Sequence, residues 1–259
     1  MKAVILAGGL GTRLGNRTHL IPKPMVEIGQ KPVIWHIMKI FSYYGINDFI
    51  ICLGYKANVI KEYFLNFEGL NNDLTINLKS NDIKFHNNKI NDSDWNVTLI
   101  NTGLNTLKGG RIKRIENYLD PGINLLTYGD GVADVNIKEL IEYHKKHKKL
   151  VTITGVHPPA RFGELIEENG IVKSFEEKPQ TSQGLINGGF MVFEHQMLDY
   201  LTVDEDCDFE IGALEHLSKE NKVMVYKHQG SWECMDNERD VKHLNFLWKN
   251  KQAFWKVWN

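Results

Sequence analysis

The amino-acid sequence predicts an α/β fold, in which a doubly wound, mostly parallel mixed sheet is flanked by helices and carries small β excursions. Two observations support this prediction. Short apolar runs without polar alternation are typical of strands that are buried on both faces of a parallel sheet. Segments with the apolar spacing of helices separate these runs along the chain. A length of 259 residues suits a single core, so we expect one domain over residues 1–259.

The first strand and the first helix are marked by their composition and by their ends. Ala3–Ala7 is apolar throughout and stops at glycines, as expected of a buried strand. The first helix follows Gly29, has Pro32 in its first turn and stops at Gly45. Its expected apolar stripe consists of Ile34, Ile37, Met38 and Phe41.

The middle of the chain continues this alternation of strands and helices. Phe49–Leu53 is a second apolar run, and a helix over residues 57–66 follows it. Residues 71–94 are rich in Asn, Asp and Lys with weak apolar alternation, which predicts an exposed strand-and-loop excursion. The remaining elements expected in this region are a strand at 97–100, a helix at 111–118 and a strand at 124–128.

The C-terminal half begins with a capping signal. Asn136 and Glu139 have capping-box spacing ahead of a helix that ends near His147. After a strand at 151–156, short strand-like runs alternate with glycine turns from residue 162 to residue 193. The last expected elements are helices at 209–219 and 240–249, and an aromatic segment at 254–258 that packs either on this chain or on a neighbouring subunit.

Composition and charge exclude several classes of protein. The 31 Lys and Arg balance 32 Asp and Glu, so no global field attracts nucleic acid or an anionic membrane. Cys52, Cys207 and Cys234 are widely separated, which argues against a disulfide framework and a zinc knuckle. A core strand begins at the N-terminus and no apolar run reaches membrane-spanning length, so we expect a cytoplasmic enzyme.

The stretch after the first strand is the most informative part of the sequence. Gly8, Gly9 and Gly11 permit a sharp turn and leave no side chain to block a ligand, so backbone amides can face phosphate oxygens. Arg13, together with Lys23 between two prolines, adds positive charge for a polyphosphate. The pattern predicts a phosphate-binding loop.

Three other glycine-rich patterns fit this stretch less well. A Walker A loop ends in Gly-Lys-Ser/Thr, whereas this segment ends in Gly11-Thr12-Arg13. A dinucleotide-binding turn requires a helix directly after the glycines, and Pro22 and Pro24 leave little room for one. A simple turn after a buried strand needs one glycine rather than three.

Asp130 is a candidate ligand for a metal ion. It lies between Gly129 and Gly131 at the end of a buried strand, where ligands bind in open α/β sheets. A carboxylate that faces a phosphate-binding loop needs a cation partner, and Mg²⁺ suits one or two carboxylates together with phosphates. The alternative is that Asp130 caps a helix or a turn.

These residues carry a resemblance to a known family. The glycine loop with Pro22-Lys23-Pro24 resembles the signature of the sugar-1-phosphate nucleotidyltransferases. Together with the segments at 31–38, 95–99 and 127–134 and with Met235-Asp236, it resembles the cytidylyltransferase branch. The resemblance implies a Rossmann-like, GT-A-like fold, a homo-oligomer, the cofactor Mg²⁺, and transfer of CMP from CTP to α-D-glucose 1-phosphate.

The resemblance also implies roles for particular residues. Arg13, Lys23 and Asp130 would be catalytic, and Asp130 and Asp236 would hold Mg²⁺. From its position alone, Asp236 could instead be the N-cap of the following helix. The implied nucleotide-binding residues are Leu6, Ala7, Gly8, Gly9, Gly11, Thr12, Arg13, Lys23, Thr106, Arg111 and Gly129, and those for the sugar phosphate are Gly163, Glu177, Lys178, Asn187 and Gly188.

Several positions depart from the cytidylyltransferase pattern, namely Arg17, Ile21, Lys108, Gly212 and Ser231. They leave open a different nucleotide or a different phosphorylated acceptor with the same chemistry. A non-catalytic nucleotide-binding subunit is a second alternative, although it would be expected to lack an Asp or Lys of the set, and none is missing. A nicotinamide-dependent dehydrogenase is a third.

Overall fold

A seven-stranded sheet forms the centre of the molecule. The computed structural model describes residues 1–12, 14, 20–86, 94–158, 164–176 and 184–258, with the side chains at 164–167 and 174–176 excepted. Six strands run in one direction, and β13 is antiparallel to both of its neighbours. The mostly parallel mixed sheet is therefore confirmed. Its strands, in spatial order, are β14 (Val223–Lys227), β10 (Val151–Val156), β13 (Ile186–Glu194), β8 (Ile123–Tyr128), β1 (Ala3–Leu6), β4 (Asp48–Leu53) and β7 (Asn96–Asn101).

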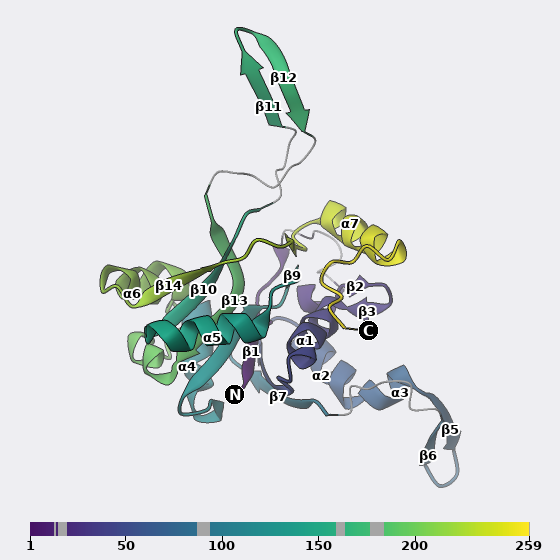
Figure 1. Cartoon of the computed structure of the whole chain (residues 1–259). Coiled ribbons are helices and arrows are strands. Elements are labelled where there is room, and N and C mark those ends of the chain that lie inside the picture. Colours follow the sequence, from purple (N-terminus) through teal and green to yellow (C-terminus); the bar gives the residue numbers. More distant parts are fainter. Residues whose placement is uncertain (13, 15–19, 87–93, 159–163, 177–183, 259) are drawn as a thin grey trace.

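Helices cover both faces of this sheet (Figure 1). Alternate residues of β1 belong to different cores, with Ala3 and Ile5 in one and Val4 and Leu6 in the other. Both faces of the strand are therefore buried, which explains why its sequence shows no polar alternation. One core is closed by α1 (Val33–Tyr43), α2 (Ala57–Leu65), α5 (Ile137–His147) and α7 (Glu238–Lys249), and the other by α4 (Lys108–Arg114), η4 (His195–Tyr200), η5 (Phe209–Leu214) and α6 (Glu215–Lys219).

The first helix and the N-cap of α5 agree with the sequence prediction, and the Glu139 carboxylate accepts from the side-chain nitrogen of Asn136, at 2.9 Å. Pro32 is the N-cap of α1, and Gly45 follows its end at φ +81°. The Asn136 side chain caps α5 by accepting a hydrogen bond from the backbone amide of Glu139, at 3.2 Å. The two ends of α1 and the start of α5 are therefore determined by local residues, as expected.

Two helices differ from the sequence prediction. The helix expected at 111–118 starts three residues earlier and stops at Arg114, and η3 (Glu116–Tyr118) follows it. Its start was missed because glycines are poor helix formers, yet a Cβ on Gly110 would lie 2.3 Å from the Asp204 carbonyl oxygen. The helix expected at 209–219 is a π-helical turn followed by α6, with non-helical angles at Ile211.

Short paired strands lie outside the central sheet. The hairpins of β5 (Asp73–Asn77) with β6 (Asp82–His86) and of β11 (Glu164–Glu168) with β12 (Ile171–Glu176) project from the body in Figure 1. The first of them confirms the expected exposed excursion up to residue 86, and residues 87–93 lie outside the described part. The other elements are α3 (Phe67–Asn71) and the pairs β2 (Glu27–Ile28) with β3 (Lys31–Pro32) and β9 (Gly131–Ala133) with β15 (Trp232–Cys234).

The aromatic segment at the C-terminus packs on its own chain. Trp255 is fully buried and stacks on Trp248 of α7, with ring centroids 6.4 Å apart. Its indole nitrogen donates to Nδ1 of His36 on α1, at 3.3 Å. Of the two alternatives from the sequence, the structure shows packing within the chain for Trp255. Among the described residues, every helix is too short or too polar to traverse a lipid bilayer.

The buried His36 makes stability depend on pH. Burial lowers the pKa of His36 to about 4, and its Nε2 lies 2.8 Å from the Ile28 carbonyl oxygen. An unfolded chain binds this proton near pH 6.5, so the unfolded state holds more protons between these values. We expect the free energy of unfolding to fall by about 2 kcal/mol from His36 alone between about pH 7 and about pH 5.

Urea unfolding at both pH values checks this expectation. His36→Gln should unfold with a smaller pH dependence, because glutamine does not titrate. His216→Gln, which removes an exposed histidine, should retain the dependence of the unsubstituted protein. An unchanged pH dependence in His36→Gln would show that another group is responsible.

Candidate active site

Lys23 lies between two carboxylates that come from distant parts of the chain. Its Nζ is 2.5 Å from Oδ2 of Asp130 and 2.6 Å from Oδ1 of Asp236. The lysine belongs to the short turn η2 (Lys23–Met25) and is largely buried. Pro22 and Pro24 on either side restrict its backbone, so the side chain has a defined direction.

Pairing of β9 with β15 brings the two carboxylates together. Asp130 directly precedes β9, Asp236 comes two residues after β15, and Gly131 is opposite Cys234. The amide of Met235 also donates to the Asp130 carbonyl oxygen, at 2.9 Å. The loop after β8 and the segment before α7 are thus held at a fixed spacing.

Asp236 is not the N-cap of α7. The cap is Asn237, whose side chain accepts hydrogen bonds from the amides of Arg239 and Asp240. The Asp240 carboxylate accepts in return from the amides of Asp236 and Asn237, at 2.8 and 3.0 Å. This capping box fixes the Asp236 backbone and leaves its carboxylate to interact with Lys23.

Lys23 carries a positive charge in this arrangement. Burial by itself lowers the pKa of Lys23, but Asp130, with the hydrogen bonds to both carboxylates, more than offsets that effect, and the pKa lies above its usual value. The site therefore contains a stable ammonium group between two acidic side chains.

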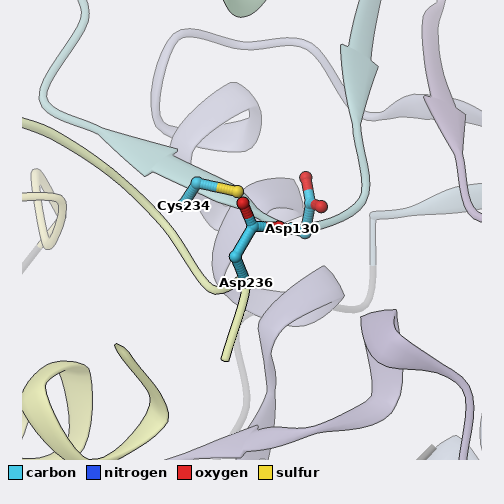
Figure 2. A group of neighbouring side chains, drawn as sticks. All are labelled: Asp130, Cys234 and Asp236. Atoms are coloured by element: carbon cyan, nitrogen blue, oxygen red, sulfur yellow. The ribbon is translucent and has the colours of Figure 1, made fainter. Parts of the chain in front are cut away.

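The same carboxylates fit a divalent cation. Figure 2 shows Asp130, Cys234 and Asp236 together, and one ligand atom of each lies within 4.8 Å of the others. Burial raises the pKa of Cys234 well above its usual value, as does Asp130, so the group stays a thiol. A thiol is a poor ligand for Mg²⁺, whereas carboxylate oxygens suit it. Asp130 and Asp236 are thus the two residues that would hold Mg²⁺.

The glycine loop lies next to Lys23 and Asp130. The amide of Gly129 donates to the carbonyl oxygen of Leu6, the last residue of β1, at 3.1 Å. A Cβ on Gly129 would lie 3.0 Å from that oxygen and 3.0 Å from Cγ of Pro24. The loop, the lysine turn and the Asp130 turn therefore meet at the carboxyl ends of β1 and β8, where open α/β sheets bind ligands.

Within the loop, Ala7 and Gly8 are buried, while Gly9 and Thr12 are exposed. Gly11 has φ +64°, a conformation that favours glycine. Arg13 lies outside the described residues.

The side chain of Arg111 packs against the glycine loop at Gly8. Its guanidinium group is buried, and a Cβ on Gly8 would lie 2.2 Å from Nη1, so a larger residue there would displace the guanidinium group. Arg111 donates hydrogen bonds to the segments that end β1, β4 and β7. Its contact with a nucleotide stays a prediction. The acceptors in the described residues are the Gly8, Leu53, Gly103 and Leu104 carbonyl oxygens and Thr102 Oγ1, at 2.7 to 3.2 Å.

Thr106 is held by an arginine that sequence reasoning missed. Thr106 is almost fully buried, and its Oγ1 accepts a hydrogen bond from Nη1 of Arg114, at 2.7 Å. The same nitrogen donates to the Thr102 carbonyl oxygen, at 2.8 Å. The only available sequence signal was the spacing of Arg114, one helical turn after Arg111.

The residues expected to bind the sugar phosphate are described only in part. Gly163, Glu177 and Lys178 lie outside the described residues. Asn187 of β13 contacts Tyr128, which comes two residues before Asp130: the Asn187 amide nitrogen donates to the Tyr128 hydroxyl group, at 2.9 Å.

Trp232 of β15 contacts the same turn of β13. Its indole nitrogen donates to the Gly188 carbonyl oxygen, at 2.7 Å, and a Cβ on Gly188 would be 2.6 Å from Cγ1 of Val156. Tyr128 and Trp232 were not among the predicted site residues, although Tyr128 belongs to the segment at 127–134 that supports the family resemblance.

The chain is similar to known proteins along its whole length. The nucleotidyl transferase family model matches residues 2–253. Two relatives align over the full length of both chains: the glucose-1-phosphate cytidylyltransferase of Salmonella typhi, 48% identical, and the probable glucose-1-phosphate cytidylyltransferase of Bacillus subtilis, 43% identical. The crystal structure of UDP-glucose pyrophosphorylase complexed with UDP-glucose has the same fold, with a TM-score of 0.68, 17% identity and coverage of 96% of this chain and 98% of that one.

Proposed function

Because the chain belongs to the nucleotidyl transferase family, we propose that it transfers CMP from CTP to α-D-glucose 1-phosphate. The observation that carries the proposal is the convergence of the glycine loop, Lys23, Asp130 and Asp236 at one edge of the sheet. The full-length alignments with the Salmonella typhi glucose-1-phosphate cytidylyltransferase and with the probable one of Bacillus subtilis support the choice of nucleotide and acceptor.

The reaction is a displacement at phosphorus. An oxygen of the sugar phosphate forms a bond to the α-phosphorus of CTP, and the bond from that phosphorus to the bridging oxygen breaks, so that pyrophosphate leaves with the electron pair. The attacking oxygen is already an anion, so no base is needed. Two anions must instead be brought together, and catalysis comes from their positioning and from neutralisation of charge.

Residues of this chain supply both effects. In this proposal the buried ammonium group of Lys23 and the backbone amides of the glycine loop contact the triphosphate. Asp130 and Asp236 would hold Mg²⁺, which when bound neutralises phosphate oxygens. Arg13, Glu177 and Lys178 stay predicted substrate contacts. A homo-oligomeric state, one domain over residues 1–259 and a cytoplasmic location also stay predictions.

The structure shows the partners of two positions that depart from the family pattern, Lys108 and Ser231. Lys108 forms an ion pair with Glu210, and the amide of Ser231 donates to Asp134, at 2.8 Å. The partners of these two residues, Glu210 and Asp134, are not members of the Lys23, Asp130 and Asp236 cluster. We therefore expect these two departures to leave the reaction unchanged and to affect the selectivity for the nucleotide or the acceptor.

A pyrophosphate-release assay tests the proposal. The purified protein is incubated with Mg²⁺, each of the common nucleoside triphosphates and dTTP, and a panel of phosphorylated sugars. We expect the largest kcat/KM for CTP with glucose 1-phosphate. A preference for another pair would assign the same chemistry to other substrates, and release with no pair would favour a non-catalytic nucleotide-binding protein.

A further inference from the structure

Lys108, which departs from the family pattern, takes part in a network of polar side chains. It is the first residue of α4, where a positive charge opposes the helix dipole. Its Nζ lies 2.6 Å from Oε1 of Glu210 and 5.5 Å from the ring centroid of Tyr128. The lysine is thus stabilised by an ion pair and an aromatic ring that belong to other elements.

The hydroxyl group of Tyr128 connects this ion pair to Asn187. It donates to Oε1 of Glu210, at 2.6 Å, and accepts from the amide nitrogen of Asn187, at 2.9 Å. Tyr128 is the last residue of β8, two positions before Asp130.

Each hydrogen bond in the network can run in one direction only. An ammonium group only donates and a carboxylate only accepts, so Glu210 receives hydrogen bonds from both Lys108 and Tyr128. Because the hydroxyl proton of Tyr128 is used on Glu210, the hydroxyl can only accept from Asn187. The carboxamide of Asn187 must therefore turn its nitrogen toward Tyr128.

A second contact fixes the other end of this carboxamide. Oδ1 of Asn187 accepts a hydrogen bond from the amide of Gly189, at 3.0 Å. Gly189 has φ +91°, and a Cβ there would lie 2.9 Å from Cδ2 of Tyr128, so the ring packs directly against this turn. Turning the carboxamide over would break both bonds, yet one N–H and one oxygen lone pair remain available for a ligand.

We propose that Tyr128, Glu210 and Lys108 are positioning residues that fix the carboxamide of Asn187 in the one orientation suited to a hydroxyl group of the sugar phosphate. The inference rests on the proposed function, because it takes Asn187 as a contact of the acceptor. A site built to hydrogen-bond a hydroxyl group rejects analogues without it, so the network contributes to the choice of sugar.

Tyr128→Phe tests the proposal by removing only the hydroxyl group. We expect the KM for glucose 1-phosphate to rise about tenfold, while the KM for CTP and kcat change by less than about twofold. Discrimination against monodeoxy analogues of glucose 1-phosphate should weaken. Glu210→Gln keeps the size of the side chain but can donate as well as accept, so it should shift the same constants in the same direction.

A double-mutant cycle separates positioning from a general structural role. Asn187→Ala should raise the acceptor KM, and adding Tyr128→Phe should raise it no further, because the group to be oriented is gone. The matched control is Tyr200→Phe. Tyr200 belongs to η4, outside the site, and its hydroxyl group donates to Glu220 and accepts from Lys222. This control should leave both KM values unchanged.

Three results would overturn the inference: additive effects of the two substitutions, an equal rise in the KM values for acceptor and nucleotide, or unchanged kinetics in Tyr128→Phe. If the unsubstituted enzyme prefers another sugar phosphate, the proposed function is wrong in its acceptor. The cycle is then measured with that acceptor, and coupling between Tyr128 and Asn187 still decides the inference.

Discussion

Replacing Lys23 with alanine is expected to lower turnover at least about a hundredfold, because a cation aimed at developing negative charge contributes on the order of 3 kcal/mol to the barrier. The ammonium group is largely buried, and its charge is fixed by two carboxylates at 2.5 and 2.6 Å. Pyrophosphate release by the purified variant measures the effect, and thermal unfolding shows whether the variant is folded.

Two further variants make this result specific. Lys23→Arg keeps the charge but replaces a compact ammonium with a planar group, so we expect it to recover only part of the activity. Lys113→Ala removes a lysine from another part of the chain, where it forms an ion pair with Glu116. We expect full turnover from this variant. Near-normal turnover in a folded Lys23→Ala variant would remove this residue from the catalytic set.

The order of strands and helices was largely predictable because it depends on local apolar patterns. β1 and β4 are apolar throughout because both of their faces are buried, and such runs are visible in the sequence. The start of α4 was not predictable, because Gly109 and Gly110 are poor helix formers, and the close approach of Asp204 and Cys207 that requires them is not visible in the local sequence. That contact comes from a segment about a hundred residues away, which local propensity does not reflect.

The candidate site shows the same division between local and distant information. Lys23 and Asp130 each stand in a distinctive local pattern, a lysine between prolines and a carboxylate between glycines after a strand. Tyr128 looks like any residue at the end of a strand, and its partner Glu210 lies 82 positions further along the chain. A polar network that forms between distant elements has no periodicity, so only the structure reveals it.

Replacing Asp130 with asparagine should lower turnover at least about a hundredfold and weaken metal binding, because the amide keeps the size of the side chain but removes its charge. Asp236→Asn should weaken metal binding in the same way. Mn²⁺ serves as a paramagnetic probe for Mg²⁺, and its free concentration in the absence of nucleotide reports binding by the protein. Glu116→Gln is the matched control, since it removes a carboxylate paired with Lys113 outside the site.

The position of Lys23 makes the metal prediction sharper, because the ammonium group and a metal ion would compete for the same two carboxylates. Lys23→Met should therefore bind Mn²⁺ more tightly than the unsubstituted protein in the absence of nucleotide, although its turnover is lower. Substitution of either aspartate should abolish this gain. If Lys23→Met instead binds Mn²⁺ no better, then Asp130 and Asp236 serve mainly to hold the lysine, and the metal must bind through the nucleotide. Opposite changes in metal affinity and turnover from one substitution are the result expected if the ammonium group and the metal compete for these two carboxylates.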